Sequence, residues 1–218
     1  MTSIQKSRSF SAWSVITRVD GEIVDKIIEK ALRETVKVTE DFVSENARNL
    51  SLLSERIASA FTGDRKLMIC GNGGSAADAQ HIAAEFVNRF ILERPPLPAI
   101  ALTTDTSIIT SIGNDYSFDE IFSKQVKALG MEGDVLLVIS TSGNSRNVIS
   151  AVKAARSLGM YTVALTGRDG GSLSPLVDMA LVVKHNATPR IQEAHQFALH
   201  VLCQLVDYIL FQHGSQED

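Results

Sequence analysis

The sequence has few of the residues that mark disulfide-bonded, nucleic-acid-binding or membrane-spanning proteins. Its two cysteines, Cys70 and Cys203, lie far apart among 218 residues, which predicts no disulfide framework and fits a reducing cytoplasm. The 21 Lys and Arg against 25 Asp and Glu leave a net charge of −4, whereas a nucleic-acid surface needs clustered cations. No apolar run approaches a membrane span or the core of a secretory signal. We therefore expect a cytoplasmic protein with no nucleic-acid and no membrane partner.

The chain is long enough for one substantial domain with a helical appendage. Neither Pro nor Gly interrupts residues 22–62, whose apolar residues recur at three and four spacings, so one or two long amphipathic helices are expected. Residues 1–20 form an N-terminal extension that we expect to be flexible, although the lack of acidic residues over residues 1–19 also suits a transit peptide. Residues 21–218 are expected to form a single domain with a helical N-terminal arm.

After Gly63, short apolar runs alternate with helical segments. The runs are continuous in apolar residues, as in strands covered on both faces, and the helices between them favour a parallel sheet. The expected strands are residues 66–70, 98–102, 134–140, 161–167 and 179–184. The expected helices are residues 75–90, 105–112, 118–129, 145–158 and 189–212. The fold class is therefore α/β, a doubly wound and mainly parallel five-stranded sheet.

Two loops of small residues follow expected strands, where open parallel sheets bind ligands. The first, residues 71–75, reads GNGGS and formally satisfies a dinucleotide fingerprint with Ala76 in third place, which would make the chain an NAD enzyme. However, the acidic residue that should follow, Asp105, comes about thirty residues later, which is late for this fingerprint. A tight strand-to-helix turn is the other explanation of the glycines.

The second loop, residues 140–145, reads STSGNS and carries four hydroxyl side chains within six residues. Hydroxyls and free amides at a helix N-terminus can surround a phosphate dianion without any lysine. The loop lacks the GK pair of a P-loop, so a nucleoside triphosphate is not expected. An N-cap followed by an exposed serine turn is the alternative.

Two expected helices carry acid and base groups on single faces. Asp78, His81 and Glu85 are spaced by three and four, and so are aligned on the helix that follows the first loop. On the last helix Gln192 and His200 share one side, whereas His195 lies about 140° from His200. We therefore expect His200 to face the site and His195 to be a surface or intersubunit residue.

Several long blocks, among them CGNGGSAADAQHIAAEF and GDVLLVISTSGNS, resemble one family across residues 45–212. The chain resembles the sugar isomerase (SIS) domain proteins, and within them the bacterial phosphoheptose isomerases, which act on sedoheptulose 7-phosphate. The resemblance implies a homotetramer whose active sites are shared between subunits. It also implies a destination for the heptose in lipopolysaccharide or another surface glycan.

The resemblance further implies roles for individual residues. The phosphate would be held by Ser140, Thr141, Ser142 and Ser145, beside first-loop residues Asn72, Gly73, Gly74 and Ser75. Further substrate contacts would be Arg89, Asp115 and Gln192. Glu85 and His200 match the acid/base pair of the family, and some members bind zinc through residues that match His81, Glu85, Gln192 and His200.

Converting a ketose phosphate to an aldose phosphate through an enediol needs two groups of suitable pKa on opposite sides of the sugar. Glu85 is expected to take the carbon-bound proton and His200 to serve the oxygens, although the roles could be exchanged. The rival functions are a non-catalytic SIS protein, either phosphosugar-binding or associated with a replication initiator, and another phosphosugar isomerase. Relatives of the replication-associated type lack the Glu and His that this chain keeps.

Overall fold

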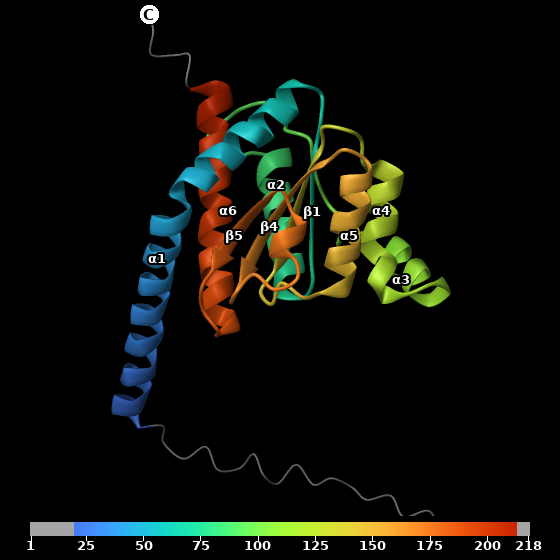
Figure 1. Ribbon diagram of the computed structural model, residues 1–218. Helices are drawn as coiled ribbons and strands as arrows, with labels where there is room; N and C mark the ends of the chain where they lie inside the picture. The colour runs from blue at the N-terminus through green and yellow to red at the C-terminus, as the bar shows by residue number, and fades with distance from the viewer. Residues whose placement is uncertain (1–19, 213–218) are drawn as a thin grey trace, which may run out of the picture. The chain divides into compact units, whose positions relative to one another are not determined.

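The computed structural model describes residues 20–212, so the extension expected for residues 1–20 lies outside the description apart from Asp20. The chain divides into two compact units, residues 1–34 and 35–218. Within the second unit, Figure 1 shows a central sheet with helices on both faces. The strands are β1 (Leu67–Gly71), β2 (Ala99–Ala101), β3 (Val135–Ser140), β4 (Tyr161–Gly167) and β5 (Met179–Val183).

The sheet has the order β2-β1-β3-β4-β5, and all four strand pairings are parallel. β1 and β3 are buried along their whole length, which explains why their sequences are apolar throughout instead of alternating. The predicted five strands and the doubly wound α/β fold are confirmed. The helices are α1 (Gly21–Thr62), α2 (Gly74–Val87), α3 (Thr106–Asp115), α4 (Ile121–Leu129), α5 (Arg146–Ser157) and α6 (Thr188–Phe211).

Successive strand residues point into two separate cores. Leu67 and Ile69 of β1 belong to the core beneath α2, α6 and the later part of α1, whereas Met68 and Cys70 belong to the core beneath α3, α4 and α5. Figure 1 shows the same division, with α2 and α6 on one face of the sheet and α4 and α5 on the other. Helices on both faces leave the carboxyl ends of the strands as the open edge for ligands.

Helix α1 is one continuous helix, which settles the choice between one and two. In the second unit its residues Leu50, Leu53 and Ile57 are buried in the core, as the apolar stripe predicts. In the first unit Ile27 and Leu32 are each 63 % exposed. The later part of α1 is thus a core element, and the earlier part carries apolar side chains that residues 20–212 leave exposed.

Among residues 20–212, α6 alone is long and apolar enough to suit a membrane span by composition, with a mean hydropathy of 1.2. Its apolar residues are interrupted by polar ones, so the sequence shows no continuous apolar run there. It is nevertheless built as a core helix: its buried face includes His195 and Asp207, and Asp207 accepts a hydrogen bond from Arg94 at 2.8 Å. Buried polar side chains with protein partners are typical of a helix packed inside a protein core.

Candidate active site

The two small-residue loops meet at the point where the strand order reverses. β1 and β3 are neighbours, and the connection that leaves β1 runs to β2 at one side of this pair whereas the connection that leaves β3 runs to β4 at the other side. Gly71 ends β1 and Ser140 ends β3, and these two strands are hydrogen-bonded neighbours. Ligands of open parallel sheets bind at this switch point, so the fold places both predicted loops where a ligand is expected.

Close approaches explain the glycines of the first loop. A Cβ on Gly71 would lie 2.8 Å from the Cβ of Ser75 and 2.9 Å from the carbonyl oxygen of Ile139. Gly73 has a φ of 56°, a conformation that favours glycine. A Cβ on Gly74 would lie 2.1 Å from Nε2 of Gln192. The glycines are therefore required by the turn and by the packing of α6, whether or not a ligand binds.

Asp105, the acidic residue considered as a ligand of a dinucleotide ribose, caps a helix. Its carboxylate is the N-cap of α3 and accepts a hydrogen bond from the amide of Ile108 at 2.9 Å. A carboxylate engaged in capping its own helix is poorly placed to bind a ribose hydroxyl. This observation argues against the NAD interpretation of the first loop.

The second loop, Ser140–Ser145, is held from outside by the segment that follows β4. Gly143 has a φ of 66°, and a Cβ there would lie 2.2 Å from the carbonyl oxygen of Gly170. The side chain of Asn144 accepts from the amide of Ser172 at 3.0 Å and donates to the carbonyl oxygen of Ser142 at 2.9 Å. Inside the loop, the hydroxyls of Ser140 and Ser145 lie 3.2 Å apart. The hydroxyls are thus fixed close together before any ligand arrives.

A pair of asparagines ties the two loops together. The amides of Asn72 and Asn147 exchange two hydrogen bonds, at 2.9 and 2.8 Å. The motif search identified Asn72 and missed Asn147, which lies two residues beyond the hydroxyl-rich loop. An amide at the first turn of the helix that leaves a ligand loop was the available signal.

The helices that leave these loops begin without side-chain caps. The N-cap residues Gly73 of α2 and Ser145 of α5 make no side-chain cap hydrogen bond, in contrast to Asp105 of α3. Helix N-termini carry unpaired amide donors and a positive dipole end, which favour an anion. The geometry therefore suits a phosphate between the start of α5 and the serine hydroxyls.

The predicted acid and base groups converge between α2 and α6. Nε2 of His81 lies 2.8 Å from Nε2 of His200 and 3.6 Å from a carboxylate oxygen of Glu85. One imidazole must donate to the other, because two unprotonated ring nitrogens would repel at this distance. A carboxylate, two imidazoles and their shared proton form a set that can move a proton.

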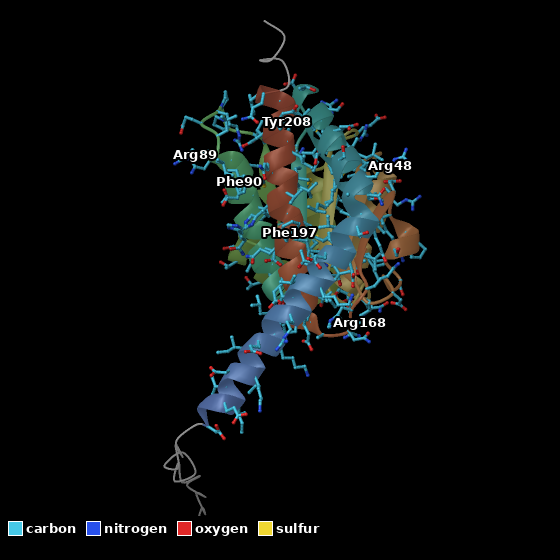
Figure 2. The ribbon with its side chains drawn as sticks, turned by 90° about the vertical axis from the view of Figure 1, so that its left-hand side faces the viewer. Arg48, Arg89, Phe90, Arg168, Phe197 and Tyr208 are labelled. Atoms are coloured by element: carbon cyan, nitrogen blue, oxygen red, sulfur yellow. The ribbon has the colours of Figure 1, made fainter. Side chains whose placement is uncertain are left out.

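Phe90 belongs to the same cluster and was missed by the motif search. Its ring stacks on His200 with centroids 5.5 Å apart and planes 26° apart. Figure 2 shows Phe90 beside α6, with Arg89 at the outer edge of the molecule. An aromatic residue directly after a predicted substrate contact was the signal that could have found it.

The remaining predicted substrate contacts lie apart from this cluster. Arg89 is paired with Glu93 at 3.3 Å, and Asp115 accepts from Asn114 at 2.9 Å near the end of α3. Both are exposed in the chain. Within residues 20–212, neither has a hydrogen bond or an ion pair to the serine loop or to His200.

The predicted zinc ligands are not brought together as one set. Gln192 lies against Gly74, and eight residues of α6, about 12 Å of helix rise, separate it from His200. His81, Glu85 and His200 have suitable donor atoms, yet the part of the chain that the structure describes holds no group of three or more His, Cys, Asp or Glu arranged for a metal. Within one chain these four residues are not arranged as a four-ligand zinc site, and zinc stays a prediction.

Asp78 lines a cavity of 320 Å³ between α2 and α6, together with Gln192 and Gln196. Its Oδ2 atom is buried and has no hydrogen-bond partner. Burial raises the pKa of this carboxyl group, and the nearby His81 partly opposes that rise. The cavity borders the first loop at Gly74, and Asp78 lies three residues before His81 on α2.

The expectation that His195 lies on the surface or between subunits is wrong. His195 is 0 % exposed, and its Nε2 lies 3.1 Å from the carbonyl oxygen of Thr166 at the end of β4. His195 and His200 do lie on different sides of α6, as predicted, but the side that carries His195 faces the sheet and not the surface. A helix that covers a sheet buries the face turned away from the ligand.

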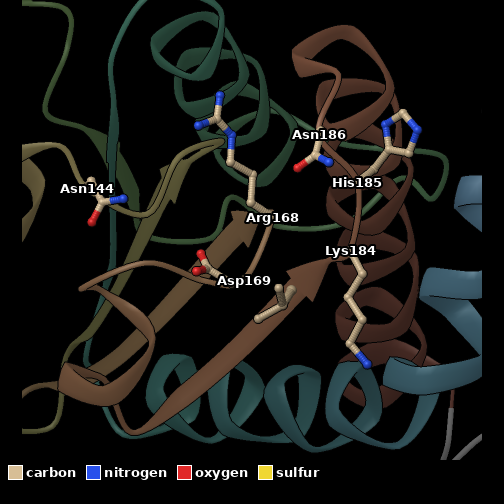
Figure 3. A pocket seen from close by; sticks show the side chains of 7 residues that line it. Asn144, Arg168, Asp169, Lys184, His185 and Asn186 are labelled. Atoms are coloured by element: carbon tan, nitrogen blue, oxygen red, sulfur yellow. The ribbon is translucent and has the colours of Figure 1, made fainter.

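A second cavity, of 810 Å³, opens at the carboxyl ends of β4 and β5 (Figure 3). Arg168 lies on its wall with a φ of 61°, which is uncommon for a residue other than glycine. The sequence search did not find this cavity, because its side chains follow three different strands. Its lining residues are Asn144, Arg168, Asp169, Val182, Lys184, His185 and Asn186.

Fold and site together define a doubly wound α/β domain with an anion-binding loop at its switch point and an acid/base cluster between two helices. Comparison with known proteins identifies the family. The sequence profile of the SIS domain matches residues 32–167, and the chain belongs to the SIS domain family.

Several similar proteins are named phosphoheptose isomerase. A phosphoheptose isomerase of Nitratidesulfovibrio vulgaris, strain Miyazaki F, is 54% identical over 187 residues, which are 86% of this chain and 90% of that protein. The solved phosphoheptose isomerase of Neisseria gonorrhoeae is 45% identical with a TM-score of 0.80, over 84% of this chain and 98% of that one. The one from Francisella tularensis is 41% identical with a TM-score of 0.81, over 84% and 97%.

Proposed function

We propose that the chain is an aldose–ketose isomerase that converts sedoheptulose 7-phosphate to D-glycero-D-manno-heptose 7-phosphate. The observation that carries the proposal is the convergence of Glu85, His81 and His200 on two helices that begin at the ligand edge of the sheet. A phosphosugar-binding protein needs the serine loop alone, whereas an isomerase also needs an acid and a base. The identity to relatives named phosphoheptose isomerase supports the choice of a heptose substrate.

The phosphate of the substrate binds in the serine loop. The hydroxyls of Ser140 and Ser145 and the uncapped start of α5 supply donors from a fixed position. Thr141 and Ser142 are half-buried in the same loop and add hydroxyls to it. Anchoring one end of the sugar holds the reacting carbons in place, which is a large part of the rate gain in such reactions.

The isomerisation moves one proton between carbons and one between oxygens. Glu85 takes a proton from C1 of the ketose to give an enediol, and a proton is then delivered to C2. His200 moves the second proton from the oxygen of C1 to the oxygen of C2, so that the aldehyde forms without net loss of protons. His81 fixes the ring of His200 through their hydrogen bond. Exchanged roles for Glu85 and His200 are the alternative assignment.

We propose that the complete site uses more than one copy of the chain, as in a homotetramer. Eleven residues of α2, about 16 Å of helix rise, separate Gly74 from Glu85. An extended seven-carbon sugar phosphate spans about 10 Å, the length of three extended residues. In an oligomer, the serine loop of one subunit can lie closer to the acid/base cluster of a neighbouring subunit than to the cluster of its own chain. Exposed apolar side chains early in α1 offer surface for such an assembly.

Mixing two inactive variants tests this sharing. Glu85→Gln removes the base, and Ser140→Ala with Ser145→Ala removes loop hydroxyls. If sites are shared, unfolding and refolding the two variants together restores part of the activity, because some sites receive both intact halves. Activity that stays absent in the mixed oligomers, or a protein that is monomeric by light scattering, would refute sharing.

We place the protein in the cytoplasm, in heptose synthesis for lipopolysaccharide or another surface glycan. Cys70 and Cys203 are buried free thiols, and burial raises the pKa of both, so they resist oxidation and need no oxidising compartment. The destination of the heptose follows the family resemblance.

The test of the proposal is incubation of purified protein with sedoheptulose 7-phosphate, with detection of the aldose heptose phosphate by chromatography and mass spectrometry. Fructose 6-phosphate and ribulose 5-phosphate serve as parallel substrates. Turnover of the heptulose alone supports the proposal. Preferred turnover of a shorter ketose would indicate another phosphosugar isomerase, and phosphate binding without any turnover would indicate a non-catalytic SIS protein.

A further inference from the structure

We infer that His195 is a positioning residue that holds the serine loop in its phosphate-binding shape. The inference rests on the proposed function and extends it to a residue that touches neither the substrate nor the acid/base cluster. It is carried by a chain of hydrogen bonds that runs from α6 through the end of β4 into the loop.

The series of hydrogen bonds has three members. Nε2 of His195 lies 3.1 Å from the carbonyl oxygen of Thr166, the last residue but one of β4. The hydroxyl of Thr166 donates to the carbonyl oxygen of Ser140 at 2.8 Å. The hydroxyl of Ser140 lies 3.2 Å from that of Ser145 across the loop. Thr166 and Ser140 are also register partners in the β3–β4 pairing, so a shift of Thr166 is passed to Ser140.

The protonation state of His195 fits this task. A carbonyl oxygen only accepts hydrogen bonds, so Nε2 must carry the proton and donate to Thr166. Burial lowers the pKa of His195 to about 4, which keeps the ring neutral and in one tautomer at neutral pH. Nδ1 is buried and has no hydrogen-bond partner. An unpaired buried acceptor destabilises the fold, so an apolar residue would serve better here if packing were the only requirement.

The surrounding packing couples α6 to the same loop by a second route. A Cβ on Gly167 would lie 2.6 Å from Ile191 of α6 and 2.7 Å from the carbonyl oxygen of Thr141. The end of β4 is therefore closely packed between α6 and the loop backbone, and no side chain would fit at Gly167. In such a contact, a small shift of β4 against α6 changes the position of the loop hydroxyls.

Two variants of His195 separate donation from packing. His195→Phe keeps a buried ring and removes the donor, whereas His195→Gln places an amide nitrogen near the position of Nε2. The matched control is Leu202→Ala, a residue that is 1 % exposed on α6 and belongs to the core away from the loop. The affinity for inorganic phosphate is measured by calorimetry, kcat and KM are measured with sedoheptulose 7-phosphate, and Tm is measured for all variants.

We expect His195→Phe to weaken phosphate binding and raise KM by roughly tenfold, the loss of one or two well-placed hydrogen bonds, with a smaller change in kcat. His195→Gln should restore most of the affinity, and Leu202→Ala should lower Tm while it leaves phosphate affinity unchanged. Wild-type affinity and KM in His195→Phe would overturn the inference, and so would an equal loss of affinity in Leu202→Ala.

The measurement of phosphate affinity distinguishes a failure of this inference from a failure of the proposed function. A wild-type protein that binds phosphate without isomerising the sugar removes the proposed reaction, and the His195 variants then decide the positioning role by affinity alone. A wild-type protein that binds no phosphate overturns both. If His195→Phe does not fold, His195→Gln decides: retained affinity supports donation by the amide, and lost affinity at unchanged Tm contradicts it.

Discussion

The serine loop and the acid/base cluster are assembled in different ways. The loop consists of six consecutive residues, and its shape depends on Gly143 and on contacts with the segment after β4. The cluster joins His81 and His200, which are 119 positions apart and meet only because α2 and α6 pack side by side on one face of the sheet. Binding chemistry can thus be local in sequence, whereas acid/base chemistry here depends on the tertiary fold. Substitutions should therefore separate binding from turnover.

Glu85→Gln should produce the largest effect. Loss of the carboxylate should lower kcat by about 10²–10⁴-fold, the usual contribution of a positioned acid or base, and leave phosphate affinity unchanged. The control is Glu93→Gln, which alters an exposed carboxylate paired with Arg89. Steady-state kinetics and phosphate calorimetry on both variants check it. A kcat within threefold of wild type in Glu85→Gln would remove this residue from the mechanism.

The free energy of unfolding should depend on pH through His195, which lies between the two regions. Between pH 6.5 and about 4 the unfolded imidazole binds a proton that the buried ring does not, so stability is lost as the pH falls through this range. The full loss is about 3 kcal/mol. Urea denaturation at pH 7 and pH 4.5 should show wild type losing stability relative to His195→Phe. Parallel pH profiles for the two proteins would contradict the assignment.

Gly143→Ala should disturb the loop without touching the cluster. The added Cβ meets the carbonyl oxygen of Gly170, and alanine is strained at a positive φ, so we expect a loss of about 1–3 kcal/mol in stability together with weaker phosphate binding. Gly113→Ala is the matched control, because nothing lies within 4 Å of its Cβ position in α3. Denaturation should find the control unchanged or slightly more stable. Equal losses in both variants would show that the loop geometry is not restrictive.

Ser145→Ala should have the smallest effect. It removes one hydroxyl of several from the loop, so KM should rise about five- to tenfold while kcat stays within a factor of two. Ser172→Ala is a suitable control, since this exposed residue is hydrogen-bonded to Asn144 of the loop through its backbone amide, which the substitution keeps. A fall in kcat without a change in KM would place Ser145 in the chemical step instead of in binding.

The same contrast explains how far sequence reasoning reached. The five strands, the order of elements and the two loops could be predicted, because continuous apolar runs and small-residue loops are local patterns. Helical spacing also aligned His81 with Glu85 and put His200 on the opposite side from His195. Burial of His195, stacking of Phe90 and pairing of Asn147 with Asn72 could not be predicted, because they depend on which helix face meets the sheet. The position of Gln192 against Gly74 likewise follows from helix packing.

The most direct test of the central claim is isomerisation of sedoheptulose 7-phosphate by the purified protein in deuterium oxide, followed by NMR of the product. An enediol route with Glu85 and His200 as acid and base predicts deuterium at C2 of the aldose heptose phosphate wherever the proton on Glu85 exchanges with solvent, and formation of the aldose slowed by about 10²–10⁴-fold in Glu85→Gln. Undiminished formation of the aldose by Glu85→Gln would contradict the account.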